Sequence, residues 1–313
     1  MSNSRDKVVC IQGATASGKS ELAERVAVIL GGEIISADSM QIYRGMDIGT
    51  AKVPASERAV AYHCIDILDP GEPYSAALFQ HDARFAIEDI RSRGRLPIIC
   101  GGTGFYVRAA LDDMDFAPGD AENPVRLKYM HMFEELGSDG LHELLRQRDP
   151  ESAALIHSHN VRRVIRAFEM LEEGESYAER KRAFATLPAC ISSVKLALDV
   201  ERQRLYERID KRVDVMIESG LVDEVRHLLD EGFRDGLTAP QAIGYKEIVA
   251  YLENDITLDE AIAQVKQATR RYAKRQLSWL RRDPEIIWLH ADEGITDTLV
   301  QHTIDQIERA ART

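Results

Sequence analysis

Residues 8–30, VVCIQGATASGKSELAERVAVIL, decide the fold class of this chain. Residues 8–12 form a short apolar run that is typical of a buried strand, and apolar residues recur at helical spacing across residues 21–30. Between these two elements, residues 13–20 match the pattern G-x-x-x-x-G-K-[ST], whose backbone N–H groups close around a phosphate. A strand, a phosphate-binding turn and a helix in this order predict a P-loop α/β fold.

The chemistry of this turn is that of an anion site. The start of the helix adds partial positive charge, Lys19 adds a formal charge, and the Ser20 hydroxyl can ligate Mg²⁺. The candidate diphosphate-binding residues are therefore Gly13, Ala14, Thr15, Ala16, Ser17, Gly18, Lys19 and Ser20. A plain glycine-rich turn with a surface lysine is the alternative, but it does not require the flanking strand and helix. The motif leaves the bound diphosphate compound open, and nucleotides are its usual ligands.

The alternation of strand and helix continues along the chain. Further buried strands are expected at residues 33–37, 96–100, 194–198 and 286–289. Residues 124–187 have a nearly continuous helical pattern with no strand signal. We therefore expect a parallel-sheet core made of residues 1–115 and 190–313, interrupted by a helical insertion at residues 116–189.

Two polar residues follow predicted strands at the edge where such sheets bind ligands. Asp38 ends the second strand, where its carboxylate can accept a proton from a nucleophile, although a turn cap is the alternative. Thr103 follows the third strand in a glycine-rich loop, where it contacts phosphate or substrate or serves only as a turn residue. A nucleotide hydrolase is expected to have an Asp at the end of such a strand, so the ATPase and GTPase interpretations are weakened.

Composition and charge narrow the class of protein. With 313 residues, 44% of them hydrophobic, no expected signal peptide and no apolar stretch of bilayer length, we expect a soluble cytoplasmic protein without membrane contact. The four cysteines lack the spacing of a zinc site. The net charge of −12 argues against a nucleic-acid partner, yet residues 266–282 hold seven basic residues and no acid. Local charge matters more than the total, because salt screens distant charges.

Two segments carry basic residues at helical spacing, which suits contact with RNA phosphates. The candidates are Arg162, Arg163 and Arg166 in the first segment, and Arg270, Arg271 and Lys274 in the second. A solvated charged helix face is the alternative, and we disfavour it for a run without acids. Some of these arginines, or Arg208 and Arg212, could instead face the diphosphate, and the sequence leaves this choice open.

Seven segments in order along the chain resemble the tRNA dimethylallyltransferase (tRNA isopentenyltransferase) family. They are GATASGKS (13–20), ADSMQIYRGMDIGTAK (37–52), HCIDILDPGEPYSAALF (63–79), GGTGFYVRAAL (101–111), VRRVIRAFE (161–169), QAIGYKEIVAYLE (241–253) and TRRYAKRQLSWLRRDPEIIWL (269–289). The second and the last are long and specific, and the matches extend over nearly the whole chain.

The resemblance implies transfer of a dimethylallyl group from dimethylallyl diphosphate to the N6 amine of an adenosine adjacent to the anticodon. It implies that the P-loop and Mg²⁺ hold this diphosphate rather than ATP, with Asp38 as general base and Lys19 and Thr103 beside it. It also implies that Asp38, Ser39, Met40 and Gln41 lie against the target adenosine in the anticodon stem-loop of tRNA. Thr103, Arg126 and residues 162–166 are implied to contact the tRNA as well. We expect a monomer with no obligate protein partner.

Three other functions fit part of the same residues. A P-loop kinase of a small metabolite would use residues 13–20 and Asp38 equally well, but would not explain the insertion or the basic run. A prenyltransferase acting on free adenine nucleotide would need neither of these two features. A non-catalytic RNA-binding protein could use the P-loop as a switch, and loss of turnover without loss of binding in an Asp38→Asn variant would exclude it.

Overall fold

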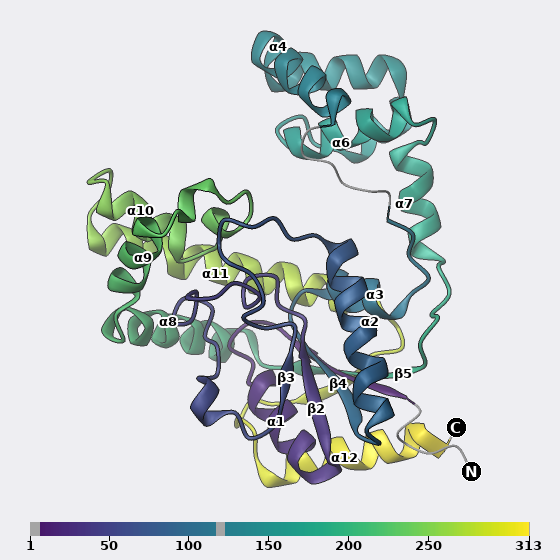
Figure 1. Ribbon diagram of the computed structural model, residues 1–313, viewed down its shortest axis with the longest axis vertical. Helices are drawn as coiled ribbons and strands as arrows, with labels where there is room; N and C mark the ends of the chain where they lie inside the picture. Colours follow the sequence, from purple (N-terminus) through teal and green to yellow (C-terminus); the bar gives the residue numbers. More distant parts are fainter. Residues whose placement is uncertain (1–6, 117–122, 313) are drawn as a thin grey trace. The chain divides into compact units, whose positions relative to one another are not determined.

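The computed structural model describes residues 7–116 and 123–312 of the chain. The chain forms two compact units, one made of Met1–Leu111 with Cys190–Thr313 and the other of Asp112–Ala189 (Figure 1). We call them the core unit and the inserted unit and describe each by itself.

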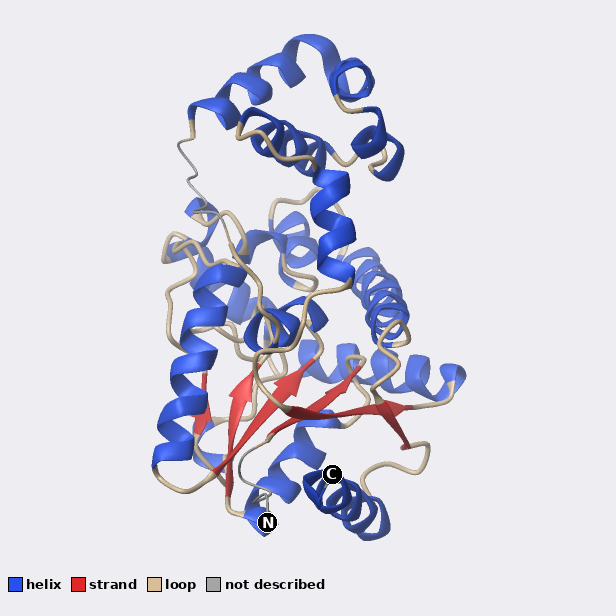
Figure 2. Cartoon of the chain, turned by 90° about the vertical axis from the view of Figure 1, so that its right-hand side faces the viewer, coloured by secondary structure: helices blue, strands red, loops and turns tan. Residues whose placement is uncertain are grey.

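The core unit is built on a six-stranded parallel sheet with the strand order β3-β2-β4-β1-β5-β6, drawn in red in Figure 2. The strands are β1 (Val8–Gly13), β2 (Gly32–Ser36), β3 (Tyr62–His63), β4 (Leu96–Gly101), β5 (Ser193–Asp199) and β6 (Ile287–His290). The predicted α/β class with a parallel sheet is confirmed. The short strand β3 was not predicted, because two residues are too few to show a periodicity.

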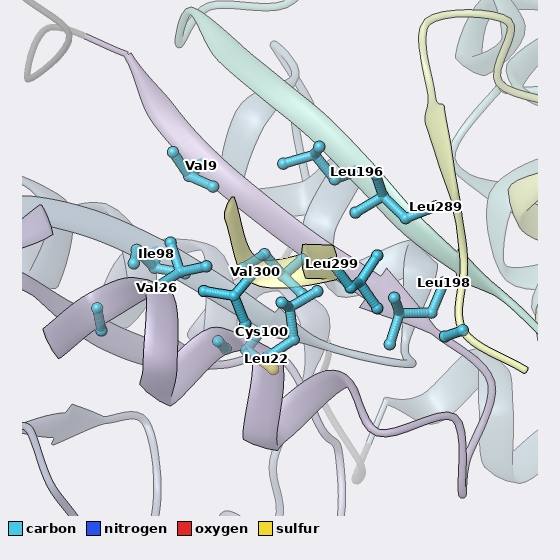
Figure 3. Close-up of a cluster of buried hydrophobic side chains, with 14 of the residues drawn as sticks. Val9, Leu22, Val26, Ile98, Cys100, Leu196, Leu198, Leu289, Leu299 and Val300 are labelled. Atoms are coloured by element: carbon cyan, nitrogen blue, oxygen red, sulfur yellow. The ribbon is translucent and has the colours of Figure 1, made fainter. Parts of the chain in front are cut away.

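Helices cover both faces of this sheet, which explains why its strands are apolar runs without alternation. One face packs against α1 (Lys19–Leu30) and α12 (Asp297–Arg312). Figure 3 shows this cluster, which includes Val9, Leu22, Val26, Ile98, Leu196, Leu299 and Val300. The other face packs against α2 (Ala76–Ser92) and α3 (Gly104–Leu111). The strands β1 and β4 are therefore fully enclosed, and only their carboxyl ends are available to a ligand.

The remaining helices of the core unit lie beyond that edge. They are α8 (Arg202–Glu218), α9 (Leu221–Asp230), α10 (Tyr245–Leu252) and α11 (Leu258–Leu280). A third apolar cluster joins α9 and α10 to the loop that follows β2, through Tyr43, Met46, Val225 and Tyr245. This loop therefore packs into an apolar core with α9 and α10, although it contains little regular structure.

The inserted unit is helical, as its sequence pattern indicates. It contains α4 (Pro124–Arg148), α5 (Pro150–Leu155), α6 (Val161–Glu172) and α7 (Tyr177–Ala185). Its core is centred on Tyr129 and Phe168, whose rings stack with centroids 4.0 Å apart. Gly137, with a φ of 69°, bends α4 in its middle because glycine adopts left-handed backbone angles without strain.

Across the part of the chain that the structure describes, no helix is both long enough and apolar enough to cross a membrane.

Candidate active site

The predicted phosphate-binding turn connects β1 to α1. Ala16 and Gly18 adopt positive φ angles of 63° and 95°, and the Ser17 amide donates to the Ala14 carbonyl oxygen at 3.2 Å. A Cβ on Gly13 would lie 2.6 Å from the Ser17 hydroxyl, so the tight turn requires glycine there. The turn thus places the first N–H groups of α1 at the carboxyl edge of the sheet. These groups have no hydrogen-bond partners within the helix.

Two cations lie next to this turn. The Lys19 ammonium donates to the Ala14 carbonyl oxygen at 3.3 Å and lines a narrow cavity together with Arg212 of α8. Burial lowers the pKa of Lys19, and the neighbouring Arg212 lowers it further. Burial also lowers the pKa of Arg212, whose guanidinium has no ion pair with any described residue. Two desolvated cations side by side favour binding of a multiply charged anion.

The two arginines of α8 that the sequence left as candidates for the diphosphate lie in different surroundings. Arg208 donates to the carbonyl oxygens of Ala291 and Asp292 at 3.0 and 2.6 Å, so its guanidinium is engaged in holding that segment. Arg212 instead lines the cavity beside Lys19.

The narrow cavity adjoins a wider one. The wider cavity has a volume of about 290 Å³ and is lined partly by apolar side chains of α8 and α11, among them Val213, Met216 and Val265. The residues that line both cavities are Thr15, Asp38, Thr50, Ala51 and Arg212. A polar, cationic compartment therefore opens into a compartment large enough for an organic group.

Asp38 lies where the two cavities meet, directly beyond the end of β2. Its Oδ1 accepts a hydrogen bond from the Met40 amide at 3.0 Å. Asp38 can therefore serve both as a turn cap and as a functional group. Its Oδ1 holds the loop through the Met40 amide, and its side chain also lines both cavities. Burial, followed by the charge of Asp38, raises the pKa of Tyr272 in the same wall to about 12.

The residues after Asp38 divide between the two cavities. Ser39 and Met40 line the wider one, and Gln41 lines the narrow one. Gln41 accepts from the Ser36 hydroxyl at 3.0 Å and donates to the Thr50 carbonyl oxygen at 3.2 Å. Every residue of the segment 38–41, which the resemblance implies to lie against the adenosine, therefore lines one or both of the cavities.

Thr103 lies near Asp38, although it lines neither cavity. Its amide donates to the Ala37 carbonyl oxygen at 3.2 Å, which places it beside the end of β2. A contact between Thr103 and RNA stays a prediction.

Sequence reasoning missed the role of Gln276 on α11. Its Oε1 accepts from the Thr15 amide at 2.9 Å, and its Nε2 donates to the Gly102 carbonyl oxygen at 3.0 Å. This buried amide therefore joins the P-loop, the loop after β4 and α11. A polar residue on the otherwise buried face of α11, in line with Val265 and Tyr272, is the signal that could have revealed it.

The sequence analysis found no acidic residue to pair with the basic residues at 266–282, and the structure corrects this for two of them. Arg270 pairs with Asp210 at 2.5 Å and Lys266 pairs with Asp214 at 2.6 Å, and both acids belong to α8. A scan along one segment of the chain cannot detect acids that another helix supplies. Arg271 and Lys274 are exposed, and neither forms an ion pair with any residue that the structure describes.

The predicted arginines of the inserted unit also fall into two groups. Arg126 and Arg166 both pair with the buried Glu169, at 2.7 and 2.8 Å. Arg162 and Arg163 are exposed at the start of α6 and have no ion pair within the described chain. Only this second pair is free to meet a phosphate without giving up a protein contact.

The donor set at the P-loop suits a magnesium ion better than a metal that needs several protein ligands. Within residues 7–116 and 123–312, no group of three or more His, Cys, Asp or Glu side chains could hold a metal. Ser20 and Asp38 line the same narrow cavity. Mg²⁺ keeps several waters and takes ligands from substrate phosphates, so one hydroxyl with a carboxylate nearby fits it.

Comparison with known proteins relates this arrangement to a family. The family model described as IPP transferase matches residues 41–283. The chain is 47% identical over 306 residues to the tRNA dimethylallyltransferase of Carboxydothermus hydrogenoformans, covering 96% of this chain and 97% of that protein. It is 46% identical over 290 residues to the tRNA dimethylallyltransferase of Bacillus subtilis, covering 92% of each.

Two solved structures are similar to this one. The full-length tRNA isopentenylpyrophosphate transferase of Bacillus halodurans aligns with a TM-score of 0.72 and 41% identity, over 98% of both chains. A eukaryotic dimethylallyltransferase, described as acting on tRNA, aligns with a TM-score of 0.76 and 30% identity, over 92% of this chain and 74% of its own.

Proposed function

This chain belongs to the IPP transferase family, and from that premise we propose that it transfers a dimethylallyl group from dimethylallyl diphosphate to the N6 amine of an adenosine beside the anticodon of tRNA. The family expected from the seven sequence segments is confirmed, and with it tRNA prenylation as the class of activity. The observation that supports the detailed reaction is the position of Asp38 at the junction of a cationic cavity and an organic one.

In this proposal, the narrow cavity holds the leaving group. As the bond between the allylic carbon and the diphosphate oxygen breaks, negative charge builds on that oxygen. Lys19, Arg212 and the amides of the P-loop lie around the cavity in which this charge appears. The Ser20 hydroxyl would help to hold Mg²⁺, which would supply further positive charge to the leaving diphosphate.

Asp38 acts as the general base. The adenine amine is a poor nucleophile because its lone pair is delocalised into the ring. As nitrogen N6 forms its bond to the allylic carbon, Asp38 accepts the N6 proton and the diphosphate leaves with the electrons of the broken bond. A positioned base of this kind contributes roughly 10²–10⁴-fold to the rate.

The wider cavity receives the adenosine. Reaching a base inside it requires the nucleotide to leave its stack, which costs a few kcal/mol and is easiest in a loop. Met40, Met216 and Tyr272 supply apolar and aromatic wall for a flat base. These apolar side chains also reduce the access of water to an allylic centre that develops cationic character.

Mass spectrometry of tRNA incubated with the protein, magnesium and dimethylallyl diphosphate tests the proposal. We expect the mass of one dimethylallyl group to be added to a single adenosine beside the anticodon. Thermal stabilisation supplies a second comparison, because dimethylallyl diphosphate should stabilise the protein and ATP should do so less. Unmodified tRNA together with phosphorylation of a metabolite by ATP would instead support the kinase alternative.

The ion pairs of α11 predict which of its cations serve RNA binding. Lys274→Ala should weaken tRNA binding and reduce the slope of log affinity against log salt by about one, since an exposed, unpaired lysine contacts phosphate without losing a partner. Arg270→Ala should change this slope less, because Arg270 pairs with Asp210. Filter binding at several salt concentrations measures both, and equal slopes for both variants would argue against the assignment.

The inserted unit offers a similar contrast on α6. Arg163→Ala should weaken tRNA binding without changing the melting temperature, because the side chain is exposed and unpaired among the described residues. Arg166→Ala should lower the free energy of unfolding by about 1.5–3 kcal/mol, because the buried Glu169 loses a charged hydrogen bond. Calorimetry and binding measured on both variants would separate the two roles. A fall in melting temperature for Arg163→Ala would contradict the division.

A further inference from the structure

The loop that follows β2 supplies one stretch of wall to both cavities. Thr50 and Ala51 line the narrow and the wider cavity, and Gly49 lines the wider one. A second stretch of wall, Gly244 and Tyr245 at the start of α10, borders the wider cavity. The two stretches meet directly, since a Cβ on Gly49 would lie 2.5 Å from the Tyr245 ring.

One carboxylate outside both cavities ties these two stretches together. Glu224 of α9 accepts hydrogen bonds from the amides of Asp47 and Ile48 through Oε2, at 3.1 and 2.7 Å. Its Oε1 accepts from the Gly49 amide at 3.2 Å and from the Tyr245 hydroxyl at 2.6 Å. Both carboxylate oxygens therefore accept from two donors each, and three of the four donors are consecutive backbone amides of the loop.

Apart from Glu224, no acceptor among the described residues receives a hydrogen bond from the amides of Asp47 and Ile48. Three consecutive N–H groups that converge on one point need an acceptor with negative charge, because the amides would otherwise lose their hydrogen bonds. Lys52 adds a second anchor to the same segment, because it pairs with Asp47 at 2.8 Å and with Asp66 at 2.5 Å. Loss of the Glu224 contacts would therefore free the amides of Ile48 and Gly49, while Asp47 stays paired with Lys52 and the Thr50 carbonyl oxygen keeps its hydrogen bond from Gln41.

We propose that Glu224 is a positioning residue for the transfer reaction, which holds the wall at residues 49–51 against Tyr245 and so sets the shape of the cavity next to Asp38. This inference rests on the proposed function only in taking the wider cavity as the site of the adenosine. The diphosphate cations Lys19 and Arg212 stand on α1 and α8, so Glu224 does not hold them.

The test compares Glu224→Gln with Glu231→Gln, a matched control at the C-cap of the same helix. The Glu231 side chain is exposed, and among the described residues its one ion pair is with His227. In glutamine, only the amide oxygen can accept hydrogen bonds. The NH₂ group that replaces the second carboxylate oxygen would face two hydrogen-bond donors. In Glu224→Gln we expect the amides of Ile48 and Gly49 to exchange with solvent at least ~10-fold faster. We also expect kcat/KM for tRNA to fall at least ~10-fold, with affinity for inorganic diphosphate and magnesium unchanged.

Tyr245→Phe removes one of the four donors and should produce a smaller fall in kcat/KM, which keeps the inference testable if the first variant folds poorly. Unchanged exchange in Glu224→Gln would overturn the inference, as would faster exchange with normal kcat/KM. An equal loss of diphosphate affinity would also overturn it, because that result indicates general loss of structure. If the wild-type protein modified no tRNA, the proposed function would fail, while the exchange rates would still decide whether Glu224 holds the loop.

Discussion

Lys19→Ala is expected to abolish binding of dimethylallyl diphosphate, with an affinity at least ~10²-fold lower than that of the wild type. The half-buried Lys19 lies beside Arg212 and the P-loop, and desolvation of its ammonium lowers its pKa. Asp38 lines the same cavity and partly offsets the Lys19 charge, and a bound diphosphate would offset it further. Removing the charge leaves a cavity with half of its cationic character.

Titration calorimetry with inorganic diphosphate and magnesium measures this effect without a need for turnover. Lys211→Ala is a matched control, because it removes an equal charge from an exposed position next to Arg212 on α8. Normal diphosphate affinity in Lys19→Ala would remove the P-loop from the mechanism. A comparable loss in Lys211→Ala would show that net charge alone governs binding.

Asp38→Asn is expected to lower turnover about 10²–10⁴-fold while leaving the affinities for diphosphate and tRNA nearly unchanged. Asparagine can still accept the hydrogen bond from the Met40 amide, so the loop after β2 keeps its conformation. In the proposed mechanism, the variant loses the ability to take the N6 proton as the new carbon–nitrogen bond forms. The change therefore isolates base catalysis from loop structure.

Single-turnover kinetics with prebound substrates measures the chemical step directly. Asp69→Asn is a suitable control, since its carboxylate is exposed and pairs with Arg44 away from the cavities. A rate for Asp38→Asn within a few-fold of the wild type would exclude Asp38 as the base. Loss of tRNA binding in the variant would indicate that the residue serves mainly to hold the loop.

Local sequence patterns predicted much of this structure. The P-loop, the parallel strands and the position of Asp38 all depend on residues close together in the chain, where apolar periodicity and glycine placement act directly on the backbone. Strand β3 escaped prediction because its two residues pair with β2 without any pattern of their own.

Partner choice between side chains could not be predicted in this way. The bond between Thr15 and Gln276 joins residues 261 positions apart, and the pairing of Arg270 with Asp210 joins residues 60 apart. Both depend on where whole helices pack. For the same reason, the sequence could not choose between Arg208 and Arg212, although they lie one turn apart on the same helix.

The sequence by itself determined the fold class, the anion-binding turn and the family. Each depends on short contiguous segments, in which residue spacing and backbone preferences set the local structure. Only the tertiary structure decided which cations remain free and which arginine joins Lys19, and only it revealed that Glu224 binds the loop that lines the cavities. These features arise when distant helices bring donors and acceptors together, since hydrogen bonds and ion pairs act over a few ångströms in space regardless of separation along the chain.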